Sequence, residues 1–166
     1  MNGSRRSTLH RVVQRVASTA LGARFFARSA HHLDRWALKL TRGGASLTSV
    51  LAGLPIVWLT TTGAKTGQPR RSPLVGLVDG EKVVVIASNF GQTHYPAWYH
   101  NLRAHPQARV TLKGQTRTYT AAEATGAERE SYWRQAVAVY AGYTAYAGRV
   151  GNRHIPIMVL TPVAEE

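Results

Sequence analysis

The feature that most constrains this chain is a series of short apolar runs separated by glycine-containing turns, which begins after Gly53. Runs of this length with glycine between them predict strands joined by hairpins. We expect strands at about 55–62, 71–79, 82–88, 108–113, 116–123 and 155–161. Asp79-Gly80 and Lys113-Gly114 provide two tight turns. Six strands linked largely by hairpins predict an antiparallel barrel or an α+β sheet, and argue against a parallel nucleotide-binding fold.

Two helices are expected among these strands. Pro96 suits the first turn of a helix that runs to about Ala104, because proline lacks the N–H group that this position leaves unpaired. Thr125 has the character of an N-cap, and Glu128 three residues later completes a capping box for a helix that runs to about Tyr140. The chain is therefore mainly β with flanking helices.

The distribution of charge divides the chain of 166 residues into two parts. Residues 1–50 hold nine Lys and Arg against one Asp, a net charge of +8, and residues 51–166 hold twelve against seven acids, a net charge of +5. We expect residues 1–50 to form a basic amphipathic helical segment and residues 51–166 to form the barrel domain. The chain has no cysteine and no metal-ligand spacing among its seven histidines, so no disulfide or metal site is expected.

The N-terminal segment leaves two interpretations open. Apolar residues recur at three- and four-residue spacing from about 8 to 30 with arginines between them, which predicts a basic amphipathic helix. The segment has neither the uninterrupted apolar length of a membrane span nor a signal-peptide cleavage pattern. The helix either packs on the domain or lies on an anionic membrane surface. We expect a cytoplasmic protein, which in the second case is peripheral on the inner face of the membrane.

The segment from Leu59 to Leu74 has the composition of an anion-binding loop. Gly63 and Gly67 accept positive φ, so the loop can turn sharply and aim backbone N–H groups into one concavity. Three cations and five hydroxyl groups accompany them: Lys65, Arg70, Arg71, Thr60, Thr61, Thr62, Thr66 and Ser72. The spacing matches neither the P-loop nor the dinucleotide-binding fingerprint, and a strand follows where those loops open a helix. The alternative is an ordinary basic hairpin tip.

Two further segments can join this loop in a cofactor site. Residues 86–89 end a buried strand in a hydroxyl and an amide, and Gly91 permits close approach of a ligand. Residues 96–101 open a helix whose first N–H groups favour phosphate, beside the aromatic rings of Trp98 and Tyr99. Taken alone, these two rings are typical of core packing. Together the segments suit a flat ring with a phosphate tail.

Tyr140, Tyr143 and Tyr146 form the fourth group. On a helix, spacing of three places their phenols along one face. They either form an aromatic stripe packed on the barrel or line a pocket for a flat substrate and supply proton donors. No hydrolytic triad, paired carboxylates or HExxH motif accompanies them, so a carried-in cofactor is the economical explanation for any chemistry.

Several motifs in this order resemble a known family. The motifs are Leu-Thr-Thr-Thr-Gly-Ala-Lys-Thr-Gly-Gln-Pro-Arg, then Ala-Ser, Pro-Ala-Trp-Tyr-His-Asn-Leu, Tyr-x-x-Tyr-x-x-Tyr and Arg-His-Ile-Pro-Ile. Over about residues 54–162 they are similar to the deazaflavin-dependent nitroreductases of actinobacteria. The resemblance implies a six-stranded antiparallel split β-barrel, related to FMN-binding barrels, that uses the deazaflavin coenzyme F-420. It implies hydride transfer from the reduced coenzyme to a quinone or nitroaromatic acceptor.

The resemblance also implies site residues. The cofactor-binding positions are Ala64, Lys65, Thr66, Arg70, Arg71, Ser72, Pro73, Leu74, Val75, Ile86, Ala87, Ser88, Asn89, Ala97, Trp98, Tyr99, His100 and Asn101. The substrate-side, catalytic positions are Ser88, Tyr140, Tyr143 and Tyr146, of which Tyr143 orients or protonates the substrate. Some members carry Lys after the serine where this chain has Asn89, and Arg71 is an extra cation that can compensate.

Other functions remain open on the residues alone. A non-catalytic carrier of coenzyme F-420 or FMN needs the basic loop but not the tyrosines. FMN is the alternative cofactor, since related split barrels bind it. A nucleic-acid partner is not expected, because the chain has the charge but no recognised nucleic-acid motif.

Overall fold

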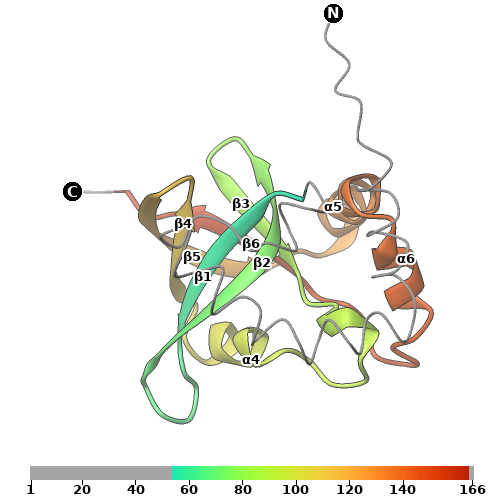
Figure 1. Cartoon of the computed structure of the whole chain (residues 1–166), viewed down its shortest axis with the longest axis horizontal. Helices are drawn as coiled ribbons and strands as arrows, with labels where there is room; N and C mark the ends of the chain where they lie inside the picture. The colour runs from blue at the N-terminus through green and yellow to red at the C-terminus, as the bar shows by residue number, and fades with distance from the viewer. Residues whose placement is uncertain (1–53, 165–166) are drawn as a thin grey trace, which may run out of the picture.

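The computed structural model describes residues 54–164 (Figure 1). The predicted helical segment 1–50 and its proposed membrane contact lie outside the described residues. The strands are β1 (Ile56–Thr62), β2 (Pro69–Asp79), β3 (Lys82–Ile86), β4 (Gln107–Leu112), β5 (Gln115–Glu123) and β6 (Ile157–Pro162). The helices are the 3-10 turn η1 (Asn89–Gly91), α4 (Ala97–Ala104), α5 (Gly126–Val139) and α6 (Gly142–Ala147). None of the helices in this part of the chain is long and apolar enough to cross a membrane.

The six strands form a closed antiparallel barrel in the order β1-β2-β3-β6-β5-β4. Strand β1 closes the barrel by pairing with β2 on one side and with β4 on the other. Consecutive strands β1 to β3, and β4 to β5, are joined by hairpins as predicted. The turn between β2 and β3 is Gly80-Glu81 and not the predicted Asp79-Gly80, because Asp79 still pairs with Lys82. The prediction of an antiparallel barrel is confirmed, and the open α+β alternative is excluded by closure.

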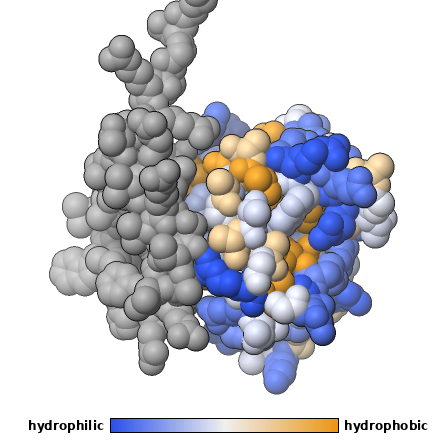
Figure 2. Space-filling model, turned by 90° about the vertical axis from the view of Figure 1, so that its right-hand side faces the viewer, coloured by the Kyte–Doolittle hydropathy of each residue, from blue (hydrophilic) through white to orange (hydrophobic). Residues whose placement is uncertain are grey.

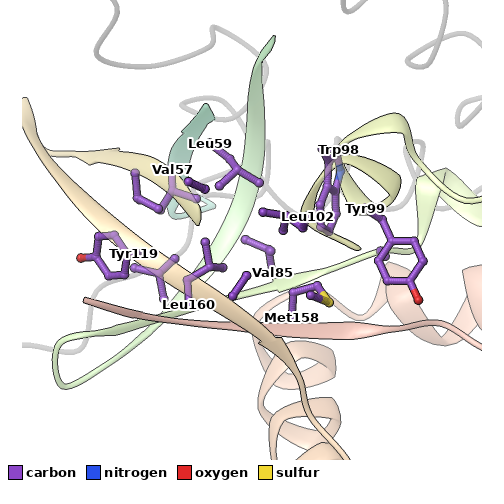
Figure 3. Packing of buried hydrophobic residues seen from close by; sticks show 14 residues of the cluster. Val57, Leu59, Val85, Trp98, Tyr99, Leu102, Tyr119, Met158 and Leu160 are labelled. Atoms are coloured by element: carbon purple, nitrogen blue, oxygen red, sulfur yellow. The ribbon is translucent and has the colours of Figure 1, made fainter. Parts of the chain in front are cut away.

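Two apolar cores lie on opposite faces of the barrel wall. The interior core contains Val57, Leu59, Val83, Val85, Leu102, Val110, Met158 and Leu160, with Trp98 and Leu102 of α4 beside the barrel residues (Figure 3). The second core lies between the outer wall and α5–α6, and it includes Val84, Ile86 and the three tyrosines. Strand β3 serves both cores because its alternate side chains face opposite ways, which explains its unbroken apolar sequence.

Local turn chemistry was predicted well, with one error. Lys113 and Gly114 take φ of 50° and 83°, as a two-residue hairpin turn requires, and Pro96 is the N-cap of α4. Thr125 is the N-cap of α5 as predicted, but its side chain makes no capping hydrogen bond, so the expected capping box is wrong. Gly126, the next residue, takes φ of 52°, and this left-handed entry does not give the geometry that the box needs.

Candidate functional site

The hairpin tip between β1 and β2, residues 63–68, uses its own N–H groups. Gly63 N donates to Gln68 O (2.9 Å), and the N–H groups of Thr66 and Gly67 donate to Gly63 O (3.2 and 2.8 Å). Gln68 N donates to Thr66 Oγ1 (3.3 Å). The N–H groups of Gly63, Thr66, Gly67 and Gln68 are thus bonded within the loop, and that of Ala64 donates to a side chain of α4. The prediction that successive N–H groups of this loop converge on an anion is therefore wrong. Any anion binding here depends on the side chains.

The cationic side chains of this hairpin are accessible to an anion. Lys65, Arg70 and Arg71 are exposed, and the guanidinium of Arg71 lies 4.4 Å from the ring centroid of Trp58 on the neighbouring strand. This cation–π contact fixes the direction of one charge while leaving its donors open to solvent. The hairpin thus presents three cations, Lys65 on the hydrogen-bonded turn and Arg70 and Arg71 at the start of β2.

The strand that follows cannot present all its predicted cofactor residues to one ligand. Successive side chains of a strand point to opposite faces, and the pairing register assigns each one. Three share the inward direction of their β1 partners: Arg70, Ser72 and Leu74. Three face outward: Arg71, Pro73 and Val75. Any one ligand surface can therefore contact at most alternate members of this run.

Asn101 ties the hairpin tip to α4. Its Oδ1 accepts a hydrogen bond from the backbone N–H of Ala64 (3.0 Å), and its Nδ2 donates to Thr61 Oγ1 (3.0 Å). Asn101 and Thr61 are both buried. The buried amide of Asn101 therefore holds the hairpin tip in position. Asn101 was predicted to bind the cofactor, but both its oxygen and its nitrogen form hydrogen bonds within the protein.

The remaining predicted residues of α4 separate into two kinds. Trp98 and Tyr99 are buried in the interior core, so the alternative reading of these rings as core packing is confirmed. Ala97 and His100 lie on the exposed side of the helix. The helix thus offers a ligand its first N–H groups and one imidazole.

A carboxylate that the sequence analysis did not single out joins α4 to the barrel. Glu123, at the end of β5, accepts a hydrogen bond from the Tyr99 hydroxyl (3.0 Å) and lies 2.9 Å from His154 Nε2. The Tyr99 hydroxyl also accepts from Arg103 Nη1 (3.1 Å). Burial raises the pKa of Tyr99, which keeps its phenol protonated as a donor. The only available signal was an acid at a strand end in a chain with few acids.

The end of β3 leads into an unusual turn. Asn89, Phe90 and Gly91 take φ of 47°, 56° and 77°, so three consecutive residues are left-handed and two of them are not glycine. The Asn89 side chain donates to His94 O (3.1 Å), which occupies its amide within the loop. The predicted residues that precede the turn are all buried: Ile86, Ala87 and Ser88.

This turn packs against α6. A Cβ on Gly91 would lie 3.1 Å from Tyr146 Cα and 3.3 Å from Arg149 Cβ, so only glycine permits this approach without a shift of the helix. The Phe90 and Tyr146 rings meet edge to face, with centroids 6.3 Å apart. Ser88 and the tyrosine group, distant in sequence, are therefore joined through the turn.

The tyrosine group forms as a cluster but not as one helical stripe. Tyr140 is the C-cap of α5, whereas Tyr143 and Tyr146 lie on α6, because the chain leaves helical geometry at Tyr140. Tertiary packing brings the rings together, with centroids 5.4 to 6.1 Å apart, and the Tyr140 and Tyr146 hydroxyls are 2.9 Å apart. Burial is the main cause that raises the pKa of each phenol. All three are therefore neutral proton donors near pH 7.

Arg153 is the second important residue that the sequence analysis did not assign, although its motif was quoted. Its Nη2 donates to Ser88 O (2.9 Å), and its guanidinium lies 4.9 Å from the Tyr95 ring centroid. The Tyr95 ring in turn contacts the Tyr99 ring of α4, with centroids 4.9 Å apart and the rings tilted by 38°. Contacts thus run from the hairpin tip through Asn101 and α4 to Ser88. The predicted groups belong to one connected region.

The surface on the α5–α6 side mixes apolar and hydrophilic side chains (Figure 2). Phe90 is one of three large apolar residues between 54 and 164 that stay exposed. Within the same residues, no group of three or more His, Asp or Glu side chains is placed to hold a metal ion.

Comparison with known proteins gives a family match and several similar chains. The profile of the F420H(2)-dependent quinone reductase family matches residues 34–162. A protein of Mycobacterium tuberculosis named as an F420H(2)-dependent quinone reductase is 37% identical over 111 residues, which cover 64% of this chain and 73% of that protein. A solved F420-H2 dependent reductase (FDR-A) is 37% identical with a TM-score of 0.60, covering 64% of this chain and 94% of that one. A solved domain-swapped dimer is 31% identical with a TM-score of 0.62, covering 80% and 98%.

Proposed function

The chain belongs to the F420H(2)-dependent quinone reductase family, and from this membership we propose that it is an oxidoreductase that uses reduced coenzyme F-420 to reduce a quinone. The bound coenzyme supplies the hydride. The protein binds and orients the reactants, keeps water from them and provides the proton that completes reduction of the acceptor. The observation that carries this proposal is a cluster of buried, protonated phenols joined through a glycine-dependent contact to Ser88.

The exposed cations of the hairpin tip would hold the anionic part of the coenzyme. Lys65 and one of Arg70 and Arg71, whose side chains point to opposite faces of β2, are the charges that one ligand can meet. Charge-assisted hydrogen bonds to such groups are among the stronger ones in proteins. Helix α4 contacts this tip through Asn101, the fifth residue of the helix. Its N-cap, Pro96, has no side-chain donor or acceptor, and Tyr99 N donates to Pro96 O (3.1 Å), so the N–H groups of Ala97 and Trp98 are the ones left for an anion.

FMN is the competing cofactor for these charges. A titration of the protein with each cofactor, followed by fluorescence, compares them directly. We expect coenzyme F-420 to bind at least tenfold more tightly than FMN. The opposite order would overturn the cofactor assignment and leave the barrel assignment intact.

Tyr143 would provide the proton donor. Hydride addition to a quinone leaves an oxyanion, and a phenol held in an apolar site can donate a hydrogen bond or a proton to it. Tyr140 and Tyr146 bond to each other, whereas no residue between 54 and 164 makes a hydrogen bond with the Tyr143 hydroxyl. Burial raises the pKa of Tyr143, so its proton is retained until an acceptor oxyanion is present.

Removing the hydroxyl group of Tyr143 tests its role as proton donor. Tyr143→Phe should preserve folding and coenzyme affinity while lowering kcat/KM for a quinone by roughly tenfold to a thousandfold, the range expected for losing such a donor. The measurement is stopped-flow oxidation of the reduced coenzyme by a quinone. Tyr132→Phe is the matched control, because Tyr132 is a phenol of the same core whose hydroxyl donates to Asp79 (2.8 Å). Equal rates in wild type and Tyr143→Phe would return Tyr143 to core packing and favour a coenzyme carrier.

Nitroaromatic compounds are a second proposed acceptor class. A flat ring with an electron-poor, oxygen-bearing group offers the same shape and the same need for a donated hydrogen bond as a quinone. Competition between a quinone and a nitroaromatic for the reduced coenzyme tests this idea. Inhibition of quinone reduction with no nitro reduction would show binding without turnover.

We propose further that residues 1–30 bring the enzyme to an anionic membrane surface, where lipid-soluble quinones reside. Their charge and amphipathic spacing support this, and each nearby Lys or Arg contributes on the order of 1 kcal/mol to binding of anionic lipid at low salt. Co-sedimentation with vesicles should require anionic lipid, fall with salt and disappear when residues 1–30 are deleted. Undiminished sedimentation of the truncated chain would assign the segment a structural role.

A further inference from the structure

The turn after β3 adopts a conformation that the chain must be forced to keep. Asn89, Phe90 and Gly91 are left-handed in succession, and Phe90 is a bulky residue for which positive φ is unfavourable. Such residues persist where surrounding contacts over-determine them, and they occur preferentially at functional sites. The turn has two hydrogen bonds of its own, from Gly91 N to Ser88 O and from Gln92 N to Asn89 O, both 3.0 Å.

Arg153 donates hydrogen bonds to backbone carbonyls on both sides of this turn. Before the turn, Nη1 donates to Ala87 O (3.1 Å) and Nη2 donates to Ser88 O (2.9 Å). After the turn, Nε and Nη2 both donate to Gln92 O (3.2 and 2.8 Å). One planar guanidinium therefore links the residues before the left-handed segment to the residue after it. A lysine could not make these bonds together, because its ammonium lacks the rigid fork of donors.

The charge of Arg153 is committed to backbone carbonyls. It forms no ion pair with any residue between 54 and 164, and burial lowers its pKa. Arg153 is half-buried, and an arginine at the surface would keep its donors in water. Here the guanidinium donors are bonded to the carbonyls on both sides of the turn, so the side chain has a role in fixing the shape of the turn.

This turn connects the two parts of the candidate acceptor site, which are Ser88 just after β3 and the tyrosines of α6. Gly91 abuts the α6 backbone at Tyr146, and the exposed Phe90 ring meets the Tyr146 ring edge to face. The residue that precedes the turn is Ser88. Release of the turn would therefore move Ser88 and Phe90 relative to the tyrosines, while the hairpin cations on the β1–β2 tip would stay in place.

We propose that Arg153 is a positioning residue that clamps the left-handed turn so that Ser88 and Phe90 form one wall of the acceptor site against Tyr146. Phe90 supplies an aromatic face to a flat acceptor and thereby sets which acceptors fit. The inference rests on the proposed function for the identity of the site, and on the geometry for the clamp itself.

The test combines amide hydrogen exchange with kinetics of the full-length chain. In Arg153→Ala and Arg153→Lys, exchange in residues 87–95 should accelerate at least about tenfold, because the turn opens locally. Coenzyme affinity should stay within about twofold, whereas kcat/KM for a quinone should fall about tenfold to a hundredfold, as a misplaced site wall predicts. Arg129→Ala is the matched control: Arg129 donates to Ile155 O (3.2 Å) on the same approach to β6, so this variant loses the same charge without touching the turn.

Phe90→Ala provides an arm that does not depend on stability, since Phe90 is 39% exposed. We expect its exchange pattern to match the wild type, with KM for a bulky quinone raised about tenfold and KM for a small one little changed, because a single aromatic contact is lost.

Each failure points to a different error. Unchanged exchange in both Arg153 variants would overturn the clamp, whatever the activity. Accelerated exchange with unchanged quinone kinetics would overturn the positioning role. A wild-type protein that binds the coenzyme but reduces no quinone, while the exchange effect remains, would overturn the proposed function and with it the acceptor wall.

Discussion

Replacing Asn101 by alanine tests whether this residue supports the fold or contacts the cofactor. The change removes two hydrogen bonds of 3.0 Å each, one to the Ala64 N–H and one to the Thr61 hydroxyl. Thr61 is 2% exposed, but its hydroxyl also donates to Arg70 O at 3.4 Å, so it loses only part of its bonding. Ala64 is exposed, and water can replace its partner.

The magnitude follows from these two environments. A buried group left without its partner costs about 1–3 kcal/mol, and a bond that water can replace costs about 0.5–1.5 kcal/mol. We therefore expect Asn101→Ala to lower the free energy of unfolding by about 1.5–3 kcal/mol. Loss of the anchor also lets the hairpin tip take more conformations, so coenzyme affinity should fall about threefold to tenfold.

Chemical denaturation monitored by tryptophan fluorescence measures the first effect, as a lower midpoint with an unchanged slope. Gln135→Ala is the control, because Gln135 is an exposed amide whose single bond to Ser131 is 3.4 Å long. Equal stability of the two variants, within about 0.5 kcal/mol, would refute the structural role of Asn101. If coenzyme affinity then fell more than a hundredfold, Asn101 would be a direct cofactor contact.

Three further predictions concern the tip and the second core. Lys65→Ala and Arg70→Ala should each weaken coenzyme binding by about 1.5–3 kcal/mol with little effect on unfolding, and affinities within twofold of wild type would remove the cationic-tip proposal. Gly63→Ala should destabilise the hairpin by about 1–3 kcal/mol, because the added Cβ would lie 2.8 Å from Thr66 Oγ1; denaturation midpoints decide this. Burial and the hydrogen bond to Asp79 raise the pKa of Tyr132 to about 12. A raised pKa stabilises the fold below the unfolded value of about 10, so stability should fall between pH 10 and 12 by an amount on the order of 1–2 kcal/mol. Tyr132→Phe should flatten that decline, and denaturation across this pH range measures it.

The strands and turns were predictable because their causes are local. Alternating or continuous apolar runs favour strands, and a turn such as Lys113-Gly114 needs only two residues that accept positive φ. The errors were also local: β2 begins at Pro69, two residues before the predicted start, and Gly126 changes the entry to α5. Six short strands with tight turns leave few ways to bury their apolar faces, so an antiparallel barrel was among the expected architectures, and closure was decided by the pairing of β1 with β4.

The site was predictable by composition but not by geometry. Cations near glycine, a serine at a strand end and repeated tyrosines mark chemistry that a sequence displays directly. Their orientation depends on the register of neighbouring strands, which splits the run from Arg70 to Val75 between two faces. It also depends on where a helix ends, which places Tyr140 on a different element from Tyr143.

Sequence by itself determined the strand content, the tight turns and the types of side chain available for binding and proton transfer, because short-range sterics and hydrophobic periodicity act within a few residues. Only the tertiary structure decided that Arg153 holds Ser88, 65 residues away, and that Asn101 holds Ala64, 37 residues away. Hydrogen bonds of an amide or a guanidinium to backbone groups carry no periodicity and no composition signal. They exist only after the closed barrel has brought distant segments within about 3 Å of each other.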